Sequence, residues 1–332
     1  MREEDIRPRD LMLSKVQCVV DDRDFLLSEK EAWETVACPA CDMWEVKPHF
    51  AKDGFAYVQC LNCETVYTSP RPTPALLKDF YEQSKNYAFW NEYIFPATEE
   101  SRRLGIFRPR ALRLAAILEA NGVRGGTLLE VGAAFGLFCD EVRALGVFDH
   151  VIAVEPTPGL AETCRNRGLT VVESVIENYE TSVEIDVVAA FEVIEHLASP
   201  ADFLRQCARL LRPNGLIVLS CPNVRGFDVA TLGPLSNTFD HEHLNYFHPS
   251  SMATLLERCD LELVEVLTPG ELDADLVRQQ ALSGSIDLDG QPFLREVLLD
   301  RWDELGDDFQ HFLQTHNMSS HMWVVARTRG AE

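Results

Sequence analysis

Ten residues, "DHEHLNYFHP" (240–249), contain three of the nine histidines in the chain and two carboxylates. Imidazole ordinarily titrates with a pKa of about 6.5, close to neutrality, and a neighbouring carboxylate can orient the ring and keep it basic. The segment is therefore a candidate for proton transfer. We expect Glu242 and His243 to carry it out, with His241 beside them.

Four of the ten cysteines form two pairs, "CPAC" (38–41) and "CLNC" (60–63). Each pair places two sulfurs on one tight turn, and two such turns bind one tetrahedral ion. The spacing predicts one structural Zn²⁺ with the ligands Cys38, Cys41, Cys60 and Cys63. A closed four-thiolate site has no open coordination position, so this zinc would stabilise a small module and would not catalyse.

Composition restricts the partners. The chain has 332 residues, 46% of them hydrophobic, and a formal net charge of −23, which would repel nucleic acid. It lacks an apolar run of about 18 residues and the apolar core of a signal peptide. We therefore expect a cytoplasmic protein with a small-molecule partner, no nucleic-acid partner and no membrane contact.

From about residue 101 onward, short apolar strands alternate with helices, which is typical of a parallel sheet covered on both faces. We expect strands within 127–131, 151–156, 169–174, 185–193, 215–223, 261–267 and 321–329, and helices over 108–122, 199–211 and 249–259. Ser199 should be the N-cap of its helix and Pro200 the first helical residue. The predicted fold class is α/β: a doubly wound, Rossmann-like sheet with an antiparallel last strand, preceded by a small zinc ribbon.

The chain is expected to have four parts: an N-terminal segment (1–36), a zinc-binding module (37–75), a helical linker or lid (76–121) and the sheet domain (122–332). Within the module, "MWEV" (43–46) and "FAYVQ" (55–59) are expected to be strands, and 75–90 should be a helix and turn. An acidic helical insert over about 272–315 should cover the site or form a homodimer face.

In a sheet of this kind the ligand lies beyond the carboxyl ends of the strands. The turn from Glu130 to Gly136 should therefore line the cofactor, and Glu155 after the next strand can accept both hydroxyls of a ribose. The glycines are spaced G-x-A-x-G, whereas a pyrophosphate site requires G-x-G-x-x-G. A cofactor with a ribose but no phosphate fits better.

The stretches "LLEVGAAFG", "AVEP", "FEVIEHLASPADFLRQCARLLRPNGLIVLSCPN" and "MWVVARTR" resemble class I S-adenosylmethionine-dependent methyltransferases over roughly residues 100–330. One departure is Ala134, where the family often has glycine. The resemblance implies S-adenosyl-L-methionine as cofactor. Glu130, Gly132 and Gly136 would face its methionine part, with Ala134 and Phe135 of the same turn also in contact, and Glu155 would hold the ribose hydroxyls with Pro156 beside it. Ser174 and Val175 would lie at the adenine, and Phe191 and Glu192 at the sulfonium. Tyr87, in the aromatic-rich segment 75–90, is expected to close over the site. For Phe191, core packing is an equally good interpretation.

The zinc module, the segment "FYEQSKNY" and the loop "HEHL-x-YF" together resemble deoxysugar C-methyltransferases that act on nucleotide sugars. This resemblance implies that Glu242 and His243 are the catalytic pair, with His243 removing the proton beside a ketone so that the enolate takes the methyl group. Asp240 stands where that family tends to have tyrosine, and those enzymes carry a further domain after the final strand. The acceptor is thus expected to be a nucleotide sugar or another natural-product precursor, and oxygen or nitrogen methylation stays open.

Two alternatives remain. Glu192, Glu195 and His196 of "FEVIEH", completed by His241 or His243, resemble the site of divalent-metal O-methyltransferases. However, "EH" at this position is widespread in class I enzymes that need no metal, where the histidine orients a loop. A non-catalytic zinc-ribbon scaffold is the other alternative, although the intact cofactor turn argues against it. Asp240 and His248 are expected to cap the polar loop.

Overall fold

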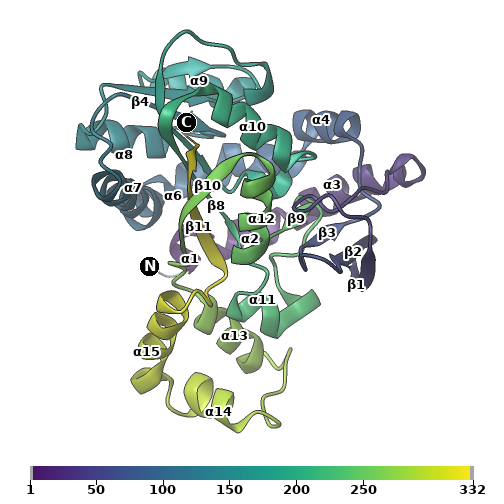
Figure 1. Cartoon of the computed structure of the whole chain (residues 1–332). Helices are drawn as coiled ribbons and strands as arrows, with labels where there is room; N and C mark the ends of the chain where they lie inside the picture. The colour runs from purple at the N-terminus through teal and green to yellow at the C-terminus, as the bar shows by residue number, and fades with distance from the viewer. Residues whose placement is uncertain (1–2, 330–332) are drawn as a thin grey trace.

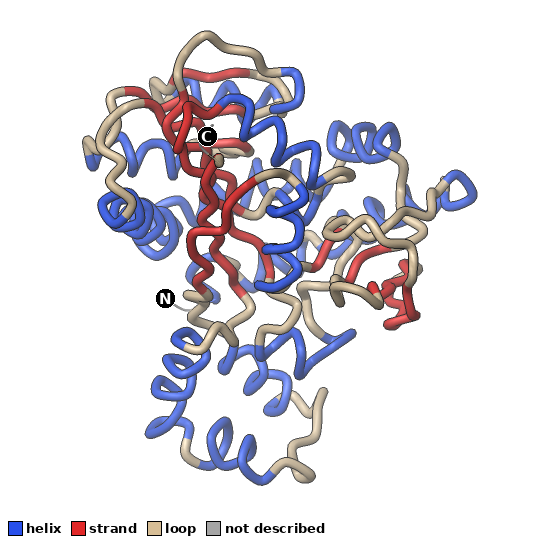
Figure 2. Tube along the Cα trace, viewed as in Figure 1, coloured by secondary structure: helices blue, strands red, loops and turns tan. Residues whose placement is uncertain are grey.

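The computed structural model of the chain describes residues 3–329, so the predicted outer limits at residues 1 and 332 lie outside the described range. Two sheets organise the chain: a seven-stranded sheet and a smaller four-stranded one, drawn in red in Figure 2. No helix among the described residues combines the length and the apolar character that crossing a bilayer requires.

The seven-stranded sheet has the order β10-β11-β8-β7-β4-β5-β6. Its strands are β4 (Thr127–Val131), β5 (His150–Val154), β6 (Thr170–Val172), β7 (Ile185–Phe191), β8 (Leu211–Pro222), β10 (Leu261–Leu267) and β11 (His321–Thr328). The pairs from β8 to β6 are parallel, and only β11 runs opposite to its neighbours. Every residue of the central strand β7 is buried, as expected for a strand covered on both faces. The predicted Rossmann-like sheet with an antiparallel last strand is confirmed.

Helices cover both faces of this sheet (Figure 1). They are α7 (Arg108–Ala120), α8 (Leu137–Leu145), α9 (Pro158–Asn166), α10 (Pro200–Leu210) and α12 (Pro249–Arg258). Successive residues of β8 point to opposite faces, so Ile217 packs in the core beneath α10 and α12, and Val218 in the core beneath α7 and α8. Ser199 Oγ accepts a hydrogen bond from Asp202 N at 3.4 Å, which confirms the predicted N-cap.

The smaller sheet has the order β1-β2-β3-β9, with all pairs antiparallel. Its strands are β1 (Val46–Lys52), β2 (Phe55–Cys60), β3 (Val66–Thr68) and β9 (Asn245–Tyr246). The strand predicted over 55–59 is confirmed, but the strand predicted over 43–46 is wrong apart from Val46. Residues 38–43 form a turn instead, closed by the hydrogen bond from Cys38 N to Met43 O at 2.8 Å. The pairing of β9, from the histidine-rich segment, with this sheet is not predictable from local sequence pattern.

Helices flank the small sheet on both sides in sequence. They are α1 (Glu3–Ile6), α2 (Arg9–Ser14), α3 (Val16–Ser28), η1 (Lys30–Ala32), α4 (Pro74–Gln83), α5 (Lys85–Phe89), the π-helix η2 (Trp90–Ile94), α6 (Phe95–Arg102) and the π-helix η3 (Arg103–Phe107). The helix and turn predicted over 75–90 are confirmed, whereas the helices before residue 30 were not predicted. Asp22 of α3 accepts hydrogen bonds from Ser84 Oγ, Lys85 N and Asn86 N at 2.5–2.9 Å, and it thereby holds the first turn of α5.

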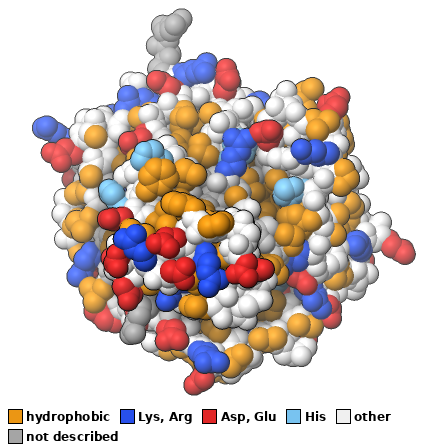
Figure 3. Space-filling model, turned by 90° about the horizontal axis from the view of Figure 1, so that it is seen from below, with side chains coloured by type: hydrophobic (Ala, Val, Ile, Leu, Met, Phe, Trp, Pro, Cys, Tyr) orange, Lys and Arg blue, Asp and Glu red, His pale blue; other side chains and the backbone are white. Residues whose placement is uncertain are grey.

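The residues of the predicted insert form α13 (Asp273–Leu282), α14 (Pro292–Arg295), the π-helix η7 (Glu296–Asp300) and α15 (Trp302–Thr315), next to α11 (Phe227–Leu232). These helices enclose a core of their own, which includes Val277 and Leu298. On the face of the molecule seen from below, hydrophobic side chains lie among acidic and basic ones (Figure 3). Phe293 of α14 is 68% exposed.

Candidate active site

The turn between β4 and α8 lies at the carboxyl edge of the large sheet, where the cofactor is predicted to bind. Gly132 and Gly136 have φ angles of 72° and 70°, a left-handed conformation that glycine adopts at little cost. A Cβ on Gly132 would lie 2.8 Å from the side chain of Val193, so a larger residue would clash. Ala134 also lies in the left-handed region, with φ of 47°. The turn thus requires glycine at Gly132, as the predicted cofactor motif does.

Glu155, directly after β5, is bonded to the same turn. Its Oε2 accepts a hydrogen bond from Ala134 N at 2.8 Å, and its Oε1 accepts one from Thr157 N at 2.9 Å. The side chain is 4% exposed, and burial raises the pKa of its carboxyl group. Each carboxylate oxygen keeps a second lone pair, so the group retains the capacity to accept ribose hydroxyls. The ribose contact predicted for Glu155, with Pro156 beside it, stays a prediction.

Glu130 and Phe135 are buried at the base of the turn. Cys139 Sγ of α8 donates a hydrogen bond to Glu130 Oε2 at 2.9 Å, and burial raises the pKa of Glu130 to about 8. The ring of Phe135 packs on Phe95 of α6 with centroids 4.1 Å apart. A cavity of about 310 Å³ is lined by Phe135 and by Thr163 of α9. The helices before α7 therefore contact the predicted cofactor turn directly.

The other predicted cofactor residues differ in their surroundings. Ser174 and Val175 follow β6 at the edge of the sheet, where Val175 is 45% exposed. Phe191, the last residue of β7, is 7% exposed, and its ring contacts those of Phe138 and Trp323 at centroid distances of 4.7 and 5.1 Å. Core packing alone is sufficient to account for Phe191.

Glu192 follows Phe191 in a strained conformation. Its φ of 55° is uncommon for a residue with a Cβ and costs roughly 1–2 kcal/mol. Ser220 Oγ of β8 donates to Glu192 Oε1 at 2.6 Å, and His321 Nδ1 lies 3.4 Å from the same oxygen. Burial would raise the pKa of Glu192, but His321, Ser220 and Arg110 hold it below its ordinary value. This strained, ionised carboxylate directly follows β7, at the edge of the sheet where the cofactor is predicted to bind.

His321 was not predicted as a site residue, although the sequence contains a signal for it. It is the first residue of β11, which runs opposite to β8. The first residue of an antiparallel strand lies at the same edge as the last residues of its neighbours. A histidine opening the last strand is therefore placed beside the site. Trp323 Nε1 donates to His321 Nε2 at 3.0 Å, which leaves Nδ1 as the protonated nitrogen that faces Glu192.

The histidine-rich segment reaches this region through a capped loop. Asp240 Oδ1 accepts hydrogen bonds from the backbone N–H groups of Glu242 and His243, each at 2.9 Å. At the other end, His248 Nδ1 accepts from Ser251 N at 3.3 Å and caps α12. The capping roles predicted for Asp240 and His248 are confirmed.

The ring of His243 is oriented by two loop residues, neither of which is Glu242. Its Nδ1 lies 2.8 Å from Thr238 O and 3.7 Å from Asp240 Oδ2. Because a carbonyl only accepts, Nδ1 carries the proton and Nε2 keeps the lone pair that a base requires. Burial disfavours the charged ring, but the carboxylates of Asp240 and Glu195 outweigh it and raise the pKa of His243 to about 9.

Glu242 is held from the N-terminal half of the chain. Its Oε1 accepts a hydrogen bond from Asn86 Nδ2 at 2.7 Å, and His241 Nε2 lies 3.6 Å from the same oxygen. Lys15 Nζ in turn donates to Asn86 Oδ1 at 3.1 Å. Burial and the charge of Asp240 raise the pKa of Glu242. The expectation that Glu242 orients the ring of His243 is therefore wrong, since the Glu242 carboxylate contacts Asn86 and His241.

Tyr87 of α5 lies beside Glu242. Burial and the charge of Glu242 raise the pKa of the Tyr87 hydroxyl well above its ordinary value. Its ring contacts that of Tyr81 with centroids 5.7 Å apart. Tyr87, predicted to close over the cofactor, is thus a neighbour of the histidine loop.

A set of potential metal ligands surrounds His243. Glu195, His196 and His243 each offer one ligand atom, and these atoms lie within 4.8 Å of one another. Glu195 is fully buried, and neither of its carboxylate oxygens is hydrogen-bonded to another residue in the described chain. Burial raises the pKa of Glu195 well above its ordinary value and lowers that of His196 to about 3. Glu192 and His241, which the metal alternative also named, do not belong to this set.

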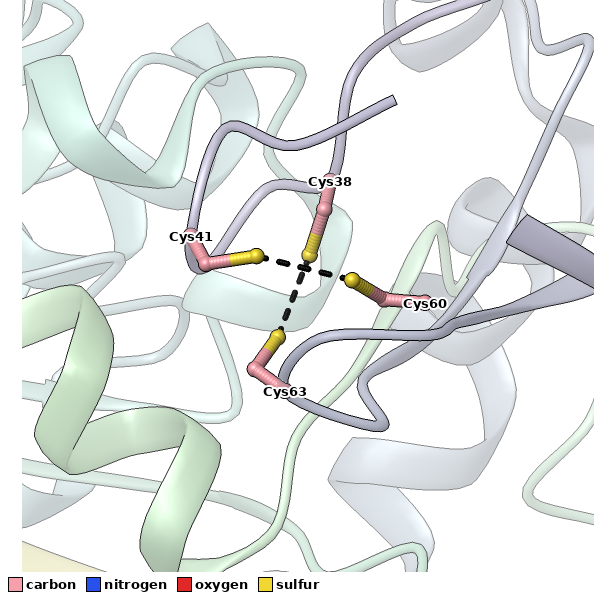
Figure 4. Close-up of side chains that lie close together, drawn as sticks. All are labelled: Cys38, Cys41, Cys60 and Cys63. Carbon is pink, nitrogen blue, oxygen red and sulfur yellow. Dashed lines mark hydrogen bonds between the residues drawn. The ribbon is translucent and has the colours of Figure 1, made fainter. Parts of the chain in front are cut away.

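The four paired cysteines lie together, with their sulfurs pointing toward one another (Figure 4). The Sγ atoms of Cys38 and Cys63 are 3.4 Å apart, and those of Cys41 and Cys60 are 3.5 Å apart. A tetrahedral zinc with Zn–S bonds of about 2.3 Å separates its sulfurs by roughly 3.8 Å, close to these distances. The hydrogen bond from Cys38 lowers the pKa of Cys63 to about 4. The donor set and its spacing fit zinc.

Residues 100–266 match the family described as "Methyltransferase domain". A ubiquinone biosynthesis O-methyltransferase of Xanthomonas oryzae pv. oryzae is 30% identical over 172 residues, which cover 47% of this chain and 70% of the relative. The protein of the same name from Vibrio campbellii is 28% identical over 177 residues, covering 47% and 74%. Among solved structures, a SAM dependent methyltransferase from Archaeoglobus fulgidus is 19% identical with a TM-score of 0.48, covering 71% of this chain and 100% of that one.

Proposed function

Since the chain belongs to the methyltransferase-domain family and is an S-adenosylmethionine-dependent methyltransferase, we propose that it methylates a carbon atom of a small biosynthetic intermediate. The acceptor would be a nucleotide sugar or another natural-product precursor. His243 would be the general base, and Glu242 would line the acceptor site beside it.

The observation that carries this proposal is the state of the His243 ring. Nδ1 is committed to Thr238 O at 2.8 Å, which leaves Nε2 as the basic nitrogen. A proton beside a ketone is weakly acidic, so a neutral ring with a raised pKa removes it faster than ordinary imidazole would. The carboxylates that raise the pKa of His243 to about 9 give its neutral form this reactivity, while they leave only a small neutral fraction near pH 7.

In this proposal the residues have the following roles in the reaction. The turn from Glu130 to Gly136 and Glu155 would bind the methyl donor, whose sulfonium supplies an activated methyl group. His243 Nε2 takes the proton from the carbon beside the ketone, and the enolate forms. The enolate carbon forms a bond to the methyl carbon while the carbon–sulfur bond breaks, and S-adenosylhomocysteine leaves. The proton stays on His243 until it exchanges with water.

A screen with deuterium tests this proposal. Nucleotide ketosugars and related ketones are incubated in heavy water with the chain and S-adenosylhomocysteine, so that no methyl transfer competes. Exchange of the C–H beside the ketone in the wild type, and its loss in His243→Gln with donor binding intact by calorimetry, would support carbon methylation. Methylated product without any exchange-competent C–H in the acceptor would contradict it.

The second candidate is divalent-metal-assisted O-methylation. Two observations favour it: the mutual approach of Glu195, His196 and His243, and the name O-methyltransferase of the relatives. A cation held by these residues would polarise an acceptor hydroxyl. Transfer that stops after chelation and returns with Mg²⁺ or Mn²⁺, together with an O-methyl signal in the product, would select this candidate.

We also propose that Cys38, Cys41, Cys60 and Cys63 bind one structural zinc. The fit of the four sulfurs supports it, and the module they close is small for its own core. Metal analysis of the purified chain should give one zinc per molecule, and less than half an equivalent in Cys41→Ser.

A further inference from the structure

The histidine-rich segment is attached to the cysteine module more closely than the sequence distance suggests. Its strand β9 pairs with β3, with Tyr246 opposite Val66 and Asn245 opposite Tyr67, and Figure 1 shows the two strands side by side. Thr68 N also donates to Leu244 O at 3.0 Å. The loop that carries His243 therefore leads directly into β9, the fourth strand of the sheet that the cysteine turns close.

Hydrogen bonds between the module and the same loop hold the loop at both ends. The Tyr57 hydroxyl of β2 donates to Asp240 O at 3.0 Å. His248 Nε2 donates to the carbonyl of Cys63, a predicted zinc ligand, at 3.0 Å. Arg71, which is 5% exposed, donates to Asn245 Oδ1 at 3.0 Å. These contacts hold loop residues both before and after His243, so the proposed base lies between fixed points of the backbone.

The strand pairing by itself is weak, because β3 has three residues and β9 has two. Short strands need a packed face or a covalent or metal constraint to keep their register. Here the packed face consists of Tyr57, Phe239 and Tyr246, whose ring centroids lie 4.6–5.7 Å apart. The other constraint is the cysteine cluster, since β3 begins three residues after Cys63.

We propose that the cysteine module is a platform that positions His243. In this proposal Tyr57 and His248 are positioning residues: they hold the histidine loop in the strand register that the metal-bound cysteines set. The inference rests on the proposed role of His243 as base. The route is short: Tyr57 holds the Asp240 backbone, and the Asp240 side chain holds the backbone N–H of His243 and lies beside its ring. Loss of the metal should therefore reduce acceptor chemistry without removing the donor site.

The first arm of the test is Tyr57→Phe, which keeps the ring in its aromatic cluster and removes only the hydroxyl that donates to Asp240. We expect kcat to fall about tenfold, a part of the roughly 10²–10⁴-fold that a general base contributes, while KM for the methyl donor stays within about twofold. The His243 imidazole resonance, assigned in histidine-labelled protein by its absence in His243→Gln, should shift. Tyr179→Phe, in the connection between β6 and β7, is the matched control and should change neither, since the bond that Tyr179 makes to Gln206 uses its carbonyl and not its hydroxyl.

The second arm removes the metal from the full chain with a zinc-selective chelator. We expect the His243 resonance to broaden or move and turnover to fall at least about tenfold, while calorimetry still detects S-adenosylhomocysteine binding. Zn²⁺ should restore both, and Mg²⁺ should restore neither, which separates the cysteine site from a catalytic cation at Glu195 and His196. Cys41→Ser should reproduce the loss, and Cys18→Ser should not.

The outcomes distinguish the inference from the function on which it rests. If His243→Gln keeps full turnover, the proposed base is wrong, yet the resonances of the remaining loop histidines still report whether the metal positions the loop. Suppose instead that His243→Gln is inactive, while the zinc-free chain and Tyr57→Phe keep wild-type turnover and an unshifted His243 signal. The proposal that the cysteine module positions His243 is then wrong, and the proposal that His243 is the base is retained.

Discussion

Replacing Asp240 by Asn should change how the rate of methyl transfer depends on pH. Asp240 Oδ2 lies 3.7 Å from His243 Nδ1, and its charge is the largest of the influences that raise the pKa of His243. The Asn side chain keeps an oxygen for the two backbone N–H groups that Asp240 Oδ1 now accepts. The loop fold should thus survive while the charge beside the ring disappears.

The size of the effect follows from the pKa. With a pKa of about 9, His243 is neutral in about one molecule in a hundred at pH 7. For each unit by which the pKa falls in the variant, the neutral fraction at pH 7 rises about tenfold, and the reactivity of the weaker base falls about threefold if the Brønsted coefficient is about one half. The variant should therefore be about threefold faster near neutrality and about threefold slower near pH 10.

The assay is kcat/KM for the methyl acceptor from pH 6 to about pH 10, measured for the wild type, Asp240→Asn and the control Asp289→Asn, which lies on the exposed insert. The first two curves should cross, and the control should follow the wild type. Parallel curves for wild type and Asp240→Asn would refute the argument that His243 is a base tuned by Asp240. A profile without an ionisation near pH 9 would favour His243 as a metal ligand.

Further predictions address the cofactor turn, the N-terminal contact and a buried carboxyl group. Gly132→Ala introduces a left-handed alanine and a 2.8 Å clash, so donor binding by calorimetry should weaken at least about tenfold, whereas Ala134→Gly should bind as well as the wild type. Asn86→Ala removes the hydrogen bond to Glu242, and kcat should fall while donor affinity stays constant; a loss of donor affinity instead would place Asn86 in the cofactor site. Burial raises the pKa of Asp228 to about 6, so wild-type stability contains a favourable proton at low pH that is lost as the pH rises through about 6. Asp228→Asn should therefore gain about 1–1.5 kcal/mol over the wild type between pH 5 and pH 8 in urea unfolding, and an equal difference at both pH values would contradict this.

The large sheet could be predicted because its strands are continuous apolar runs. β7 reads "IDVVAAF", and a run of this kind between helices has few other places to lie than the centre of a parallel sheet. The helix starting at Pro200 was equally readable, since Ser199 and Pro200 specify a helix start locally. The N-terminal helix α3 shows no such signal, because its apolar residues form no clear stripe along one face of the helix. Only Asp22 and Leu26 of this helix become buried. Its position depends on tertiary contacts to α5, which a single sequence does not display.

The sequence predicts which residue types lie in the candidate site better than it predicts which side chains contact one another there. His243 does lie around one point with Glu195 and His196, because their segments follow the carboxyl ends of neighbouring strands. The partner of His243 was wrongly predicted, since adjacency in sequence favoured Glu242 whereas the turn folded by Asp240 directs these two side chains apart. Glu242 instead meets Asn86, 156 residues earlier. Long-range contacts of this kind depend on how the helices dock, and local spacing carries no information about them.

Relatives that use the same methyl donor need not share a methyl acceptor, because the family match covers only part of this chain. Residues 100–266, which match the family, contain the cofactor turn, Glu155 and His243. Groups that would hold the proposed acceptor side lie outside this range: Asn86 on Glu242, the cysteine module on the histidine loop, and His321 on Glu192. Because the family match ends before or begins after each of them, it carries no information on these three supports. Because binding energy that discriminates acceptors must come from groups that touch or position the acceptor, the specificity of this enzyme should follow the regions that flank the family match.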